Sequence, residues 1–218
     1  MDGTLVDSEK LWTVALERVA ERLGGVLSGA ARTAMIGQDI DHSIRMLIAD
    51  VGSAAESSVV RSMLLDVTAE LFREGMPWQP GASALLDEVR AAGISTALVT
   101  ATYRSLVEIA LETLGPERFD VLVCGDEVER PKPDPEPYLR AMELLGVTAD
   151  QSLAVEDSPN GSRSAAAAGV PVLVVPSEVA VPQAPGLVFA GSLVDVDVAR
   201  LQQIHRDRAG AGSTAVAG

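Results

Sequence analysis

The sequence is poor in aromatic residues and has a single cysteine. Phe, Trp and Tyr together make up 3% of 218 residues, so we expect a core built from Ala, Val, Leu and Ile. With Cys124 alone no internal disulfide bond can form, which suits a reducing cytoplasm. No apolar run approaches the ~18 residues needed to cross a bilayer, and no secretory signal opens the chain. These absences predict a cytoplasmic protein with no membrane partner.

Positive charge is also scarce. Lys and Arg number 17 against 31 Asp and Glu, which gives a formal net charge of −14 at pH 7. Such a surface repels nucleic acid and anionic membranes, so neither is expected as a partner. An anionic substrate then needs a local cation to attract it. The charge balance therefore points to a bound metal ion and one or two well-placed Lys or Arg side chains.

The first third of the chain contains helical patterns only. Apolar residues recur at helical spacing in four segments: residues 9–23, 29–35, 41–51 and 54–72. Two prolines and a glycine in residues 76–81 then mark a boundary. The sequence therefore predicts a helical unit over residues 10–77.

Beyond this boundary, strand patterns alternate with helical ones. Strands are expected at residues 94–99, 120–123, 152–155, 171–175 and 187–190, with helices between them and at 195–204. Such alternation implies right-handed crossovers and a parallel sheet. We therefore expect an α/β fold: a doubly wound, Rossmann-like core of residues 1–9 and 78–208 with the helical unit inserted. Residues 209–218 are small and polar, and are expected to form a disordered tail.

Four short segments stand at or just after predicted strand ends, where sheets of this kind bind ligands. They are residues 1–9 (MDGTLVDSE), 98–102 (LVTAT), 130–139 (RPKPDPEPYL) and 153–161 (LAVEDSPNG). Each alone has an ordinary structural explanation. Acidic pairs at strand ends are usually solvated turns, a threonine there is usually a helix N-cap, and a lysine between prolines usually lies in a surface loop. The functional interpretation therefore rests on the order and spacing of all four.

Together these segments supply the parts of a phosphoryl-transfer site. A phosphoryl group in transfer spreads negative charge over its oxygens, so catalysis consists mostly of positioning and charge compensation. Glu156 and Asp157 form a carboxylate pair that suits Mg²⁺, and Lys132 adds a compact positive charge. Thr100 offers a hydroxyl and a backbone N–H group. Asp2 can carry a proton to or from the ester oxygen.

In this order the segments resemble the haloacid dehalogenase (HAD) superfamily, in its branch of small phosphatases and phosphomutases of the phosphoglycolate phosphatase and β-phosphoglucomutase type. The resemblance extends to about Val175 and implies Mg²⁺-dependent catalysis through an aspartyl-phosphate. Asp2 matches the general acid/base, and its backbone carbonyl is expected to bind Mg²⁺. Asp157 matches the metal-binding carboxylate, and Glu156 supports or shares that role.

The second and third motifs of the superfamily match Thr100 and Lys132. The resemblance makes both catalytic: Thr100, with the neighbouring Ala101, is expected to bind the transferring phosphoryl group. Lys132 is expected to pair with the nucleophile and the phosphate. Because dehalogenases of this superfamily lack the acid that Asp2 matches, its presence favours a phosphatase.

The helical unit resembles a type 1 cap domain, which closes over small soluble substrates and excludes water. The loop of residues 37–39 is expected to face the active site, so Gln38, Asp39, His42 and Arg45 are candidate specificity residues. Alternatively they only cap and decorate the following helix, which we favour slightly for His42 and Arg45. An arginine of the kind that holds a second phosphate is not evident in this loop, which weakens a phosphomutase assignment.

The chain departs from the superfamily pattern at its start. The motif reads Asp, any residue, Asp, Gly, Thr, and the attacking aspartate would stand directly before Met1. The apolar strand that leads into it is central in this fold, so its neighbours are expected to have unpaired backbone groups. We favour a start set too late or a shortened chain over a non-catalytic descendant, because the rest of the set is intact. The chain as given is expected to lack aspartyl-phosphate chemistry.

The expected function is hydrolysis of a small phosphate monoester, such as a sugar phosphate or phosphoglycolate, with Mg²⁺ as cofactor. The alternatives are a phosphomutase acting on sugar phosphates and a non-catalytic protein that binds metal or phosphate. The expected partner is a small phosphorylated metabolite, and the expected state is a monomer or weak dimer.

Overall fold

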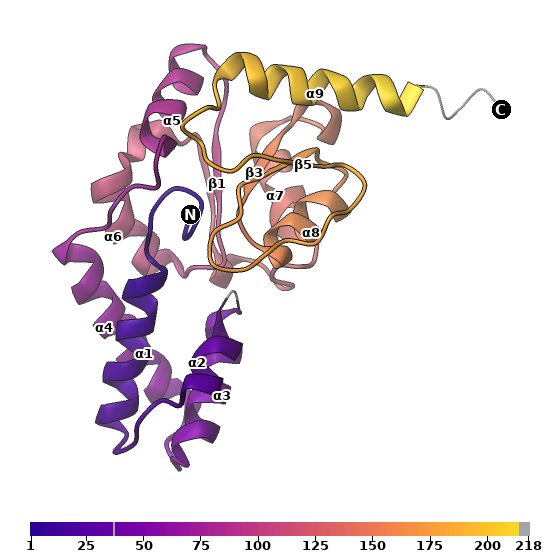
Figure 1. Cartoon of the computed structure of the whole chain (residues 1–218). Helices are drawn as coiled ribbons and strands as arrows, with labels where there is room; N and C mark the ends of the chain where they lie inside the picture. The colour runs from indigo at the N-terminus through magenta and orange to yellow at the C-terminus, as the bar shows by residue number, and fades with distance from the viewer. Residues whose placement is uncertain (37, 214–218) are drawn as a thin grey trace.

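The computed structural model describes residues 1–36 and 38–213 (Figure 1). Gly37, in the loop expected to face the active site, and residues 214–218 lie outside them. The first part of the chain folds into four helices: α1 (Glu9–Arg22), α2 (Gly29–Met35), α3 (Ile40–Val51) and α4 (Ser57–Glu74). We call these the helical unit. No strand falls among these described residues, as the sequence predicted.

The helical unit encloses an apolar core of its own. Ile44, Leu47, Val60 and Leu64 are each at most 1% exposed and belong to one cluster with α1 and α2 residues. Local signals in the sequence set the helix ends. The Asp39 carboxylate accepts the His42 N–H at the start of α3 (2.7 Å), and a left-handed glycine follows the end of that helix.

The remainder alternates helices and strands. The strands are β1 (Ala97–Val99), β2 (Val121–Val123), β3 (Ala154–Glu156), β4 (Val172–Val174) and β5 (Leu187–Phe189). The helices are α5 (Ala82–Ala91), α6 (Arg104–Leu114), α7 (Glu136–Leu145), α8 (Pro159–Ala167) and α9 (Val198–Ser213), with short 3₁₀ turns at Pro116–Arg118, Gly125–Glu127 and Ala149–Gln151. The predicted α/β class is confirmed.

All strand pairs are parallel, but they form two sheets rather than one. β1 pairs with β2, while β3, β4 and β5 pair in that order. In the described part of the chain no strand joins β1 to β3. Each strand spans three residues, fewer than the apolar runs predicted, because a ladder extends only as far as a partner is available.

Helices cover both faces of the strands. Tyr138 and Met142 of α7 pack with α8 against one face, together with the side chain of Ala154. α5 and α9 pack on the other face against Leu173 and Val155. Figure 1 shows β1 and β3 in the middle of the molecule, α9 across their upper ends and the helical unit at the lower left. Since the strands are parallel, their carboxyl ends all point toward the helical unit.

The last helix extends further than the sequence predicted. α9 continues to Ser213, so residues 209–213 of the expected disordered tail are helical. Ala has the highest helix propensity, and because extending an existing helix costs less than starting one, α9 continues past the glycines that alternate with alanine there. None of the helices in residues 1–36 and 38–213 is long and apolar enough to cross a membrane.

Candidate active site

A cleft of about 620 Å³ separates the helical unit from the carboxyl ends of β1 and β3. The residues predicted from the four motifs converge on it: Asp2, Thr100, Ala101, Lys132, Glu156 and Asp157 all line it. Gln38 and Asp39 line the opposite wall, whereas His42 and Arg45 are not among the described residues that line it. The cleft therefore brings together predicted residues that lie far apart in the sequence.

The Asp-Gly-Thr segment forms a tight turn that only glycine permits. Gly3 has φ +71°, and a Cβ atom there would lie 2.2 Å from the Asp157 Oδ2 atom. The Met1 carbonyl accepts the Leu5 N–H across this turn (2.8 Å). Because Gly3 has no side chain, the first motif can lie directly against the carboxylate of the fourth motif.

Three donors fix the carboxylate of Asp2. Ser8 Oγ (2.5 Å) and Trp12 Nε1 (3.0 Å) donate to Oδ1, and Thr102 Oγ1 donates to Oδ2 (2.7 Å). Ser8 lies at the N-cap position of α1, but its side chain makes no capping bond. Its hydroxyl serves Asp2 instead. Because Trp12 belongs to α1, the orientation of this carboxylate is tied to the helical unit.

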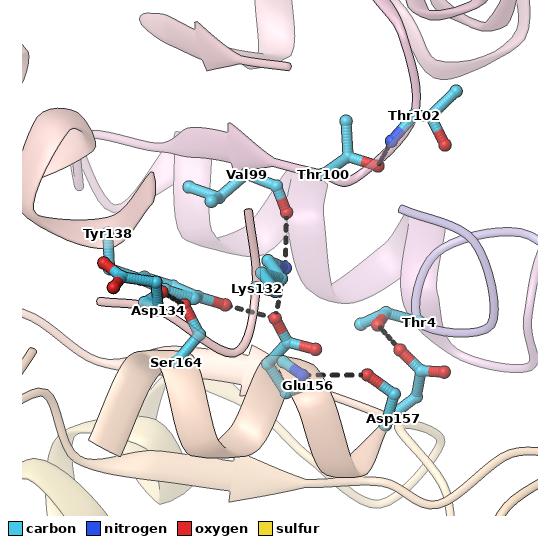
Figure 2. A network of polar contacts seen from close by, with 12 residues as sticks. Thr4, Val99, Thr100, Thr102, Lys132, Asp134, Tyr138, Glu156, Asp157 and Ser164 are labelled. Atoms are coloured by element: carbon cyan, nitrogen blue, oxygen red, sulfur yellow. Dashed lines mark hydrogen bonds and ion pairs between the residues drawn. The ribbon is translucent and has the colours of Figure 1, made fainter. Parts of the chain in front are cut away.

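Lys132 forms a buried bridge between the ends of β1 and β3 (Figure 2). Its Nζ donates to the Val99 carbonyl (3.0 Å) and to Glu156 Oε1 (2.5 Å), and it lies 5.1 Å from the ring centroid of Tyr138. The Tyr138 hydroxyl donates to the same Glu156 oxygen. Burial raises the pKa of Tyr138 well above its ordinary value, and the Glu156 charge raises it further, so this hydroxyl stays a donor.

Asp157 carries a charge that its surroundings compensate poorly. Its side chain is buried, and Thr4 Oγ1 donates to Oδ1 (2.6 Å). Burial, followed by repulsion from Glu156, raises the pKa of Asp157 to about 6, although Thr4, the N-terminal ammonium group and Lys132 each lower it. A divalent cation beside this carboxylate would supply the missing positive charge.

The donor chemistry around Asp157 fits Mg²⁺. The Oε2 atom of Glu9 is buried with no hydrogen-bond partner among the described residues, and Glu9 Oε1 lies 3.4 Å from the point that a Gly3 Cβ would occupy, close to Asp157. Within the described ranges no three His, Cys, Asp or Glu side chains form a ready metal cage. Mg²⁺ needs no such cage, because it is commonly held by one or two carboxylates, waters and substrate phosphate.

Five residues that touch the predicted set were not singled out from the sequence: Thr4, Ser8, Trp12, Thr102 and Tyr138. All five lie within ten positions of a predicted site residue. A repeated hydroxyl two positions after Thr100 was the available signal for Thr102. No periodicity could have assigned the indole of Trp12 to Asp2, because α1 alone would place that ring in the core.

The chain belongs to the haloacid dehalogenase-like hydrolase family. The model of that family matches residues 1–175. A phosphorylated carbohydrates phosphatase of Thermotoga maritima is 31% identical over 171 residues, which are 78% of this chain and 79% of that protein. A phosphoglycolate phosphatase of Cupriavidus necator is 32% identical over 199 residues, which are 89% of this chain and 86% of that protein.

The fold is also similar to that of a solved structure. The crystal structure of CbbY from Rhodobacter sphaeroides in complex with phosphate matches with a TM-score of 0.83 at 25% identity, covering 93% of this chain and 96% of that one. By family, the protein is a HAD-type phosphatase, a hydrolase that acts on phosphate esters. Its family contains phosphatases and phosphomutases that act on phosphorylated compounds.

Proposed function

We propose that the cleft is built for magnesium-dependent hydrolysis of a small phosphate monoester through an aspartyl-phosphate intermediate. The observation that carries this proposal is the convergence of Asp2, Thr100, Lys132 and Asp157 on one cleft at the carboxyl ends of the strands. A proton-transfer group, a hydroxyl, a cation and a buried carboxylate are the groups that phosphoryl transfer to a carboxylate requires.

Each group has a role that its contacts support. Asp2, oriented by three donors, would protonate the leaving ester oxygen and later take a proton from the attacking water. Thr100, with the backbone of Ala101, would bind the phosphoryl oxygens. Lys132 would neutralise charge on the phosphate and on the attacking carboxylate.

Mg²⁺ would be held by Asp157 and the backbone carbonyl of Asp2, and would supply charge compensation for the phosphoryl oxygens. Glu156 has a more indirect part in this scheme, because Lys132 and Tyr138 already occupy its Oε1 atom. Through these contacts it would position Lys132, as the acidic partner in the ion pair that bridges the two sheets.

The attacking carboxylate belongs, by the family resemblance, directly before Met1. Met1 lies buried at the edge of the cleft, so a residue joined to it would enter the site near Lys132 and Asp157. The ester oxygen would leave as a carboxyl-phosphate bond forms, and water would then cleave that bond to release inorganic phosphate and restore the carboxylate.

The helical unit would act as a cap over the cleft, with residues 10–77 as the cap domain and residues 1–9 and 78–208 as the core domain. Lys10 and Arg32 also line the cleft and are paired with Asp7 (3.0 Å) and Glu17 (2.8 Å). These cations would attract an anionic metabolite despite the acidic surface. We place the protein in the cytoplasm, as a monomer or weak dimer.

The test is release of inorganic phosphate from a panel of sugar phosphates and phosphoglycolate. Three proteins are compared: the chain as given, the chain extended before Met1 by an apolar strand ending in Asp, and the same extension ending in Asn. We expect turnover only with the Asp extension and only with Mg²⁺, abolished by chelation. A folded Asp-extended chain that hydrolyses no ester of the panel would overturn the proposal and favour a non-catalytic binding protein.

The phosphomutase alternative is distinguished with the same proteins. A mutase keeps the phosphoryl group in its closed site and converts one sugar phosphate into another in the presence of a catalytic bisphosphate. If the Asp-extended chain isomerises sugar phosphates only with bisphosphate present and releases little phosphate, the mutase is the correct assignment.

A further inference from the structure

Each of the two opposing walls of the cleft continues into a residue that contacts the other wall. On the strand side, residues 100–102 line the cleft and Tyr103 follows them; on the side of the helical unit, residues 38–40 line it and Asp41 follows. The Tyr103 hydroxyl donates to Asp41 Oδ2 (3.2 Å), although 62 positions separate the two residues. The bond therefore joins the helical unit to the loop after β1 at the edge of the cleft.

The ring of Tyr103 packs as if it belonged to the helical unit. It lies against the apolar cluster of α1–α4, and among the described residues of that cluster and its border it is the only one that lies outside residues 1–74. Burial, and then the charge of Asp41, raises the pKa of Tyr103, whereas Arg61 lowers it, so the hydroxyl stays a donor. Tyr103 is thus held by packing and by one polar contact.

The acceptor is oriented within the helical unit itself. Arg61 of α4 donates from Nε (3.0 Å) and from Nη2 (2.5 Å) to Asp41 Oδ1. These two bonds fix the rotation of the carboxylate and leave Oδ2 to the tyrosine. Asp41 also lies in the first turn of α3, where the helix dipole favours a negative charge. The position of the acceptor therefore does not depend on Tyr103.

The loop that carries Tyr103 also carries the groups proposed to bind phosphate. Thr100 and Ala101 precede it, and the Thr102 N–H donates to Thr100 Oγ1 (3.1 Å). The Thr102 hydroxyl donates to Asp2 (2.7 Å). Because these residues follow one another directly, a displacement of Tyr103 by the helical unit would also displace them.

We propose that Tyr103 is a positioning residue that acts as a latch: its bond to Asp41 holds the helical unit against the loop of residues 100–103, and loss of this bond opens the cleft. The benefit of opening, entry and exit of a phosphorylated metabolite, rests on the proposed function; the latch itself does not. Catalysis by the site would require the latched arrangement, since this arrangement sets the position of Thr100 relative to Asp2.

The bond has the properties of a contact that breaks and forms again. Its length of 3.2 Å exceeds the ~2.7–2.8 Å most common for hydroxyl donors, so its strength is modest. The side chains of Arg61 and Asp41 are 36% and 43% exposed, so water reaches the pair and can replace the tyrosine hydroxyl. A buried, saturated network would resist such exchange.

The alternative is a permanent structural contact, and removal of one oxygen atom distinguishes the two. Tyr103→Phe keeps the ring against the apolar cluster. A permanent contact predicts a slightly lower melting temperature and one unchanged arrangement of the helical unit. The latch predicts that a second, more open arrangement becomes populated, by about threefold or more over the parent, because a lost hydrogen bond shifts an equilibrium by that order.

The experiment measures the distance between two nitroxide labels by pulsed electron paramagnetic resonance. The labels are attached through Ser58→Cys on α4 and Glu143→Cys on α7, both exposed positions. Ser58 lies roughly 24 Å along α4 from the end of that helix, so a rotation of the helical unit moves it far. Cys124 is buried, and burial raises the pKa of its thiol to about 12, so it stays unlabelled.

Two further variants separate the latch from a general loss of ion pairs. Arg61→Gln frees the Asp41 carboxylate to rotate and should also populate the longer distance, at least about twofold. The double variant with Tyr103→Phe should be no more open than Tyr103→Phe alone, because Arg61 acts through the same bond. Arg104→Gln is the matched control: it removes an ion pair with Glu127 one position from Tyr103 without touching the helical unit, and should leave the distances unchanged.

The latch is refuted if neither Tyr103→Phe nor Arg61→Gln increases the longer-distance population, or if Arg104→Gln increases it equally. Inorganic phosphate with Mg²⁺ then tests the link to the proposed function, because a ligand that prefers the closed arrangement shifts the population toward it. Saturating phosphate should reduce the longer-distance population of Tyr103→Phe at least twofold. Opening in this variant without any response to phosphate would support the latch and count against the proposed function. A response to phosphate without opening in either variant would do the reverse.

Discussion

The helical unit and the sheets enclose their apolar residues differently. In the helical unit, Leu47 is fully buried in the apolar cluster of the four helices and lines neither the cleft nor a second cavity, which lies between the two sheets. Around the sheets, Leu98 is equally hidden from solvent but lies against this cavity, which has a volume of about 610 Å³. Low exposure alone therefore does not measure packing, because a side chain beside a void loses contacts on that side.

The largest expected effect tests this difference directly. Leu47→Ala, in the filled core, should lower the free energy of unfolding by about 3–4 kcal/mol. Leu98→Ala should cost only about half as much, because its side chain already lacks neighbours toward the cavity. Urea denaturation of both variants at one pH measures the pair. Equal losses would show that the cavity walls are as tightly packed as the helical unit.

A second prediction uses the charge of Asp157. Between pH 3.8 and about 6 the native carboxyl keeps a proton that the unfolded chain releases, so stability falls as the pH rises and stays lower above about pH 6. Asp157→Asn lacks this penalty. Without Mg²⁺ the variant should be more stable than the parent at pH 8, by on the order of 1–3 kcal/mol, and similar near pH 3.5.

Thermal melts at the two pH values, in chelator, provide the measurement. Added Mg²⁺ should then stabilise the parent at pH 8 and leave the variant unchanged, since the variant has no carboxylate to offer. If the variant melts lower than the parent at both pH values, the hydrogen bond from Thr4 to the carboxylate stabilises the fold more than burial of the charge destabilises it.

The contact between the two regions gives a smaller effect. Trp12→Phe removes the indole donor to Asp2 but keeps an aromatic ring against Phe72, whose centroid lies 6.1 Å away. We expect a loss of about 1 kcal/mol in unfolding free energy, since Ser8 and Thr102 still donate hydrogen bonds to the Asp2 carboxylate. Trp78→Phe is the matched control. If both variants lose the same amount, the bond to Asp2 contributes nothing of its own.

The smallest effect is expected on the rim of the cleft. The Lys10 side chain is 76% exposed and forms an ion pair with Asp7. Lys10→Ala should change the unfolding free energy by less than about 0.5 kcal/mol, because solvent screens exposed pairs. Denaturation at low and high salt checks this, and a loss above about 1 kcal/mol would show that α1 depends on this pair.

Much of the fold could be predicted because its signals are local. The apolar spacing of residues 29–35 and the proline-glycine boundary at 76–81 specify elements without long-range information. The end of α9 was placed too early, because helix ends fray and small residues give a weak stop signal. The split of the sheet into two could be anticipated only through the family resemblance, since strand pairing is a non-local property.

The candidate site also has a part that the sequence predicts and a part that it does not. The order of the motifs identified Asp2, Thr100, Lys132, Glu156 and Asp157 as neighbours, and the structure brings them to one cleft; their roles stay predictions. The partners that orient them were not predictable, because Tyr138 and Trp12 reach the site from helices whose apolar spacing explains them equally well as core residues. Side-chain hydrogen bonds across elements have no periodic signature in the sequence.

The fluorescence of the Trp12 indole can also report on the relative position of the helical unit and the rest of the molecule. The chain has two tryptophans, and the other, Trp78, stacks with Arg118 away from the cleft. In a Trp78→Phe background all tryptophan emission therefore comes from a ring that stands on the helical unit and touches a carboxylate of the other part. Any rotation between the two that breaks this contact would change the solvent around one fluorophore, so such a rotation could be followed in real time without attaching a dye.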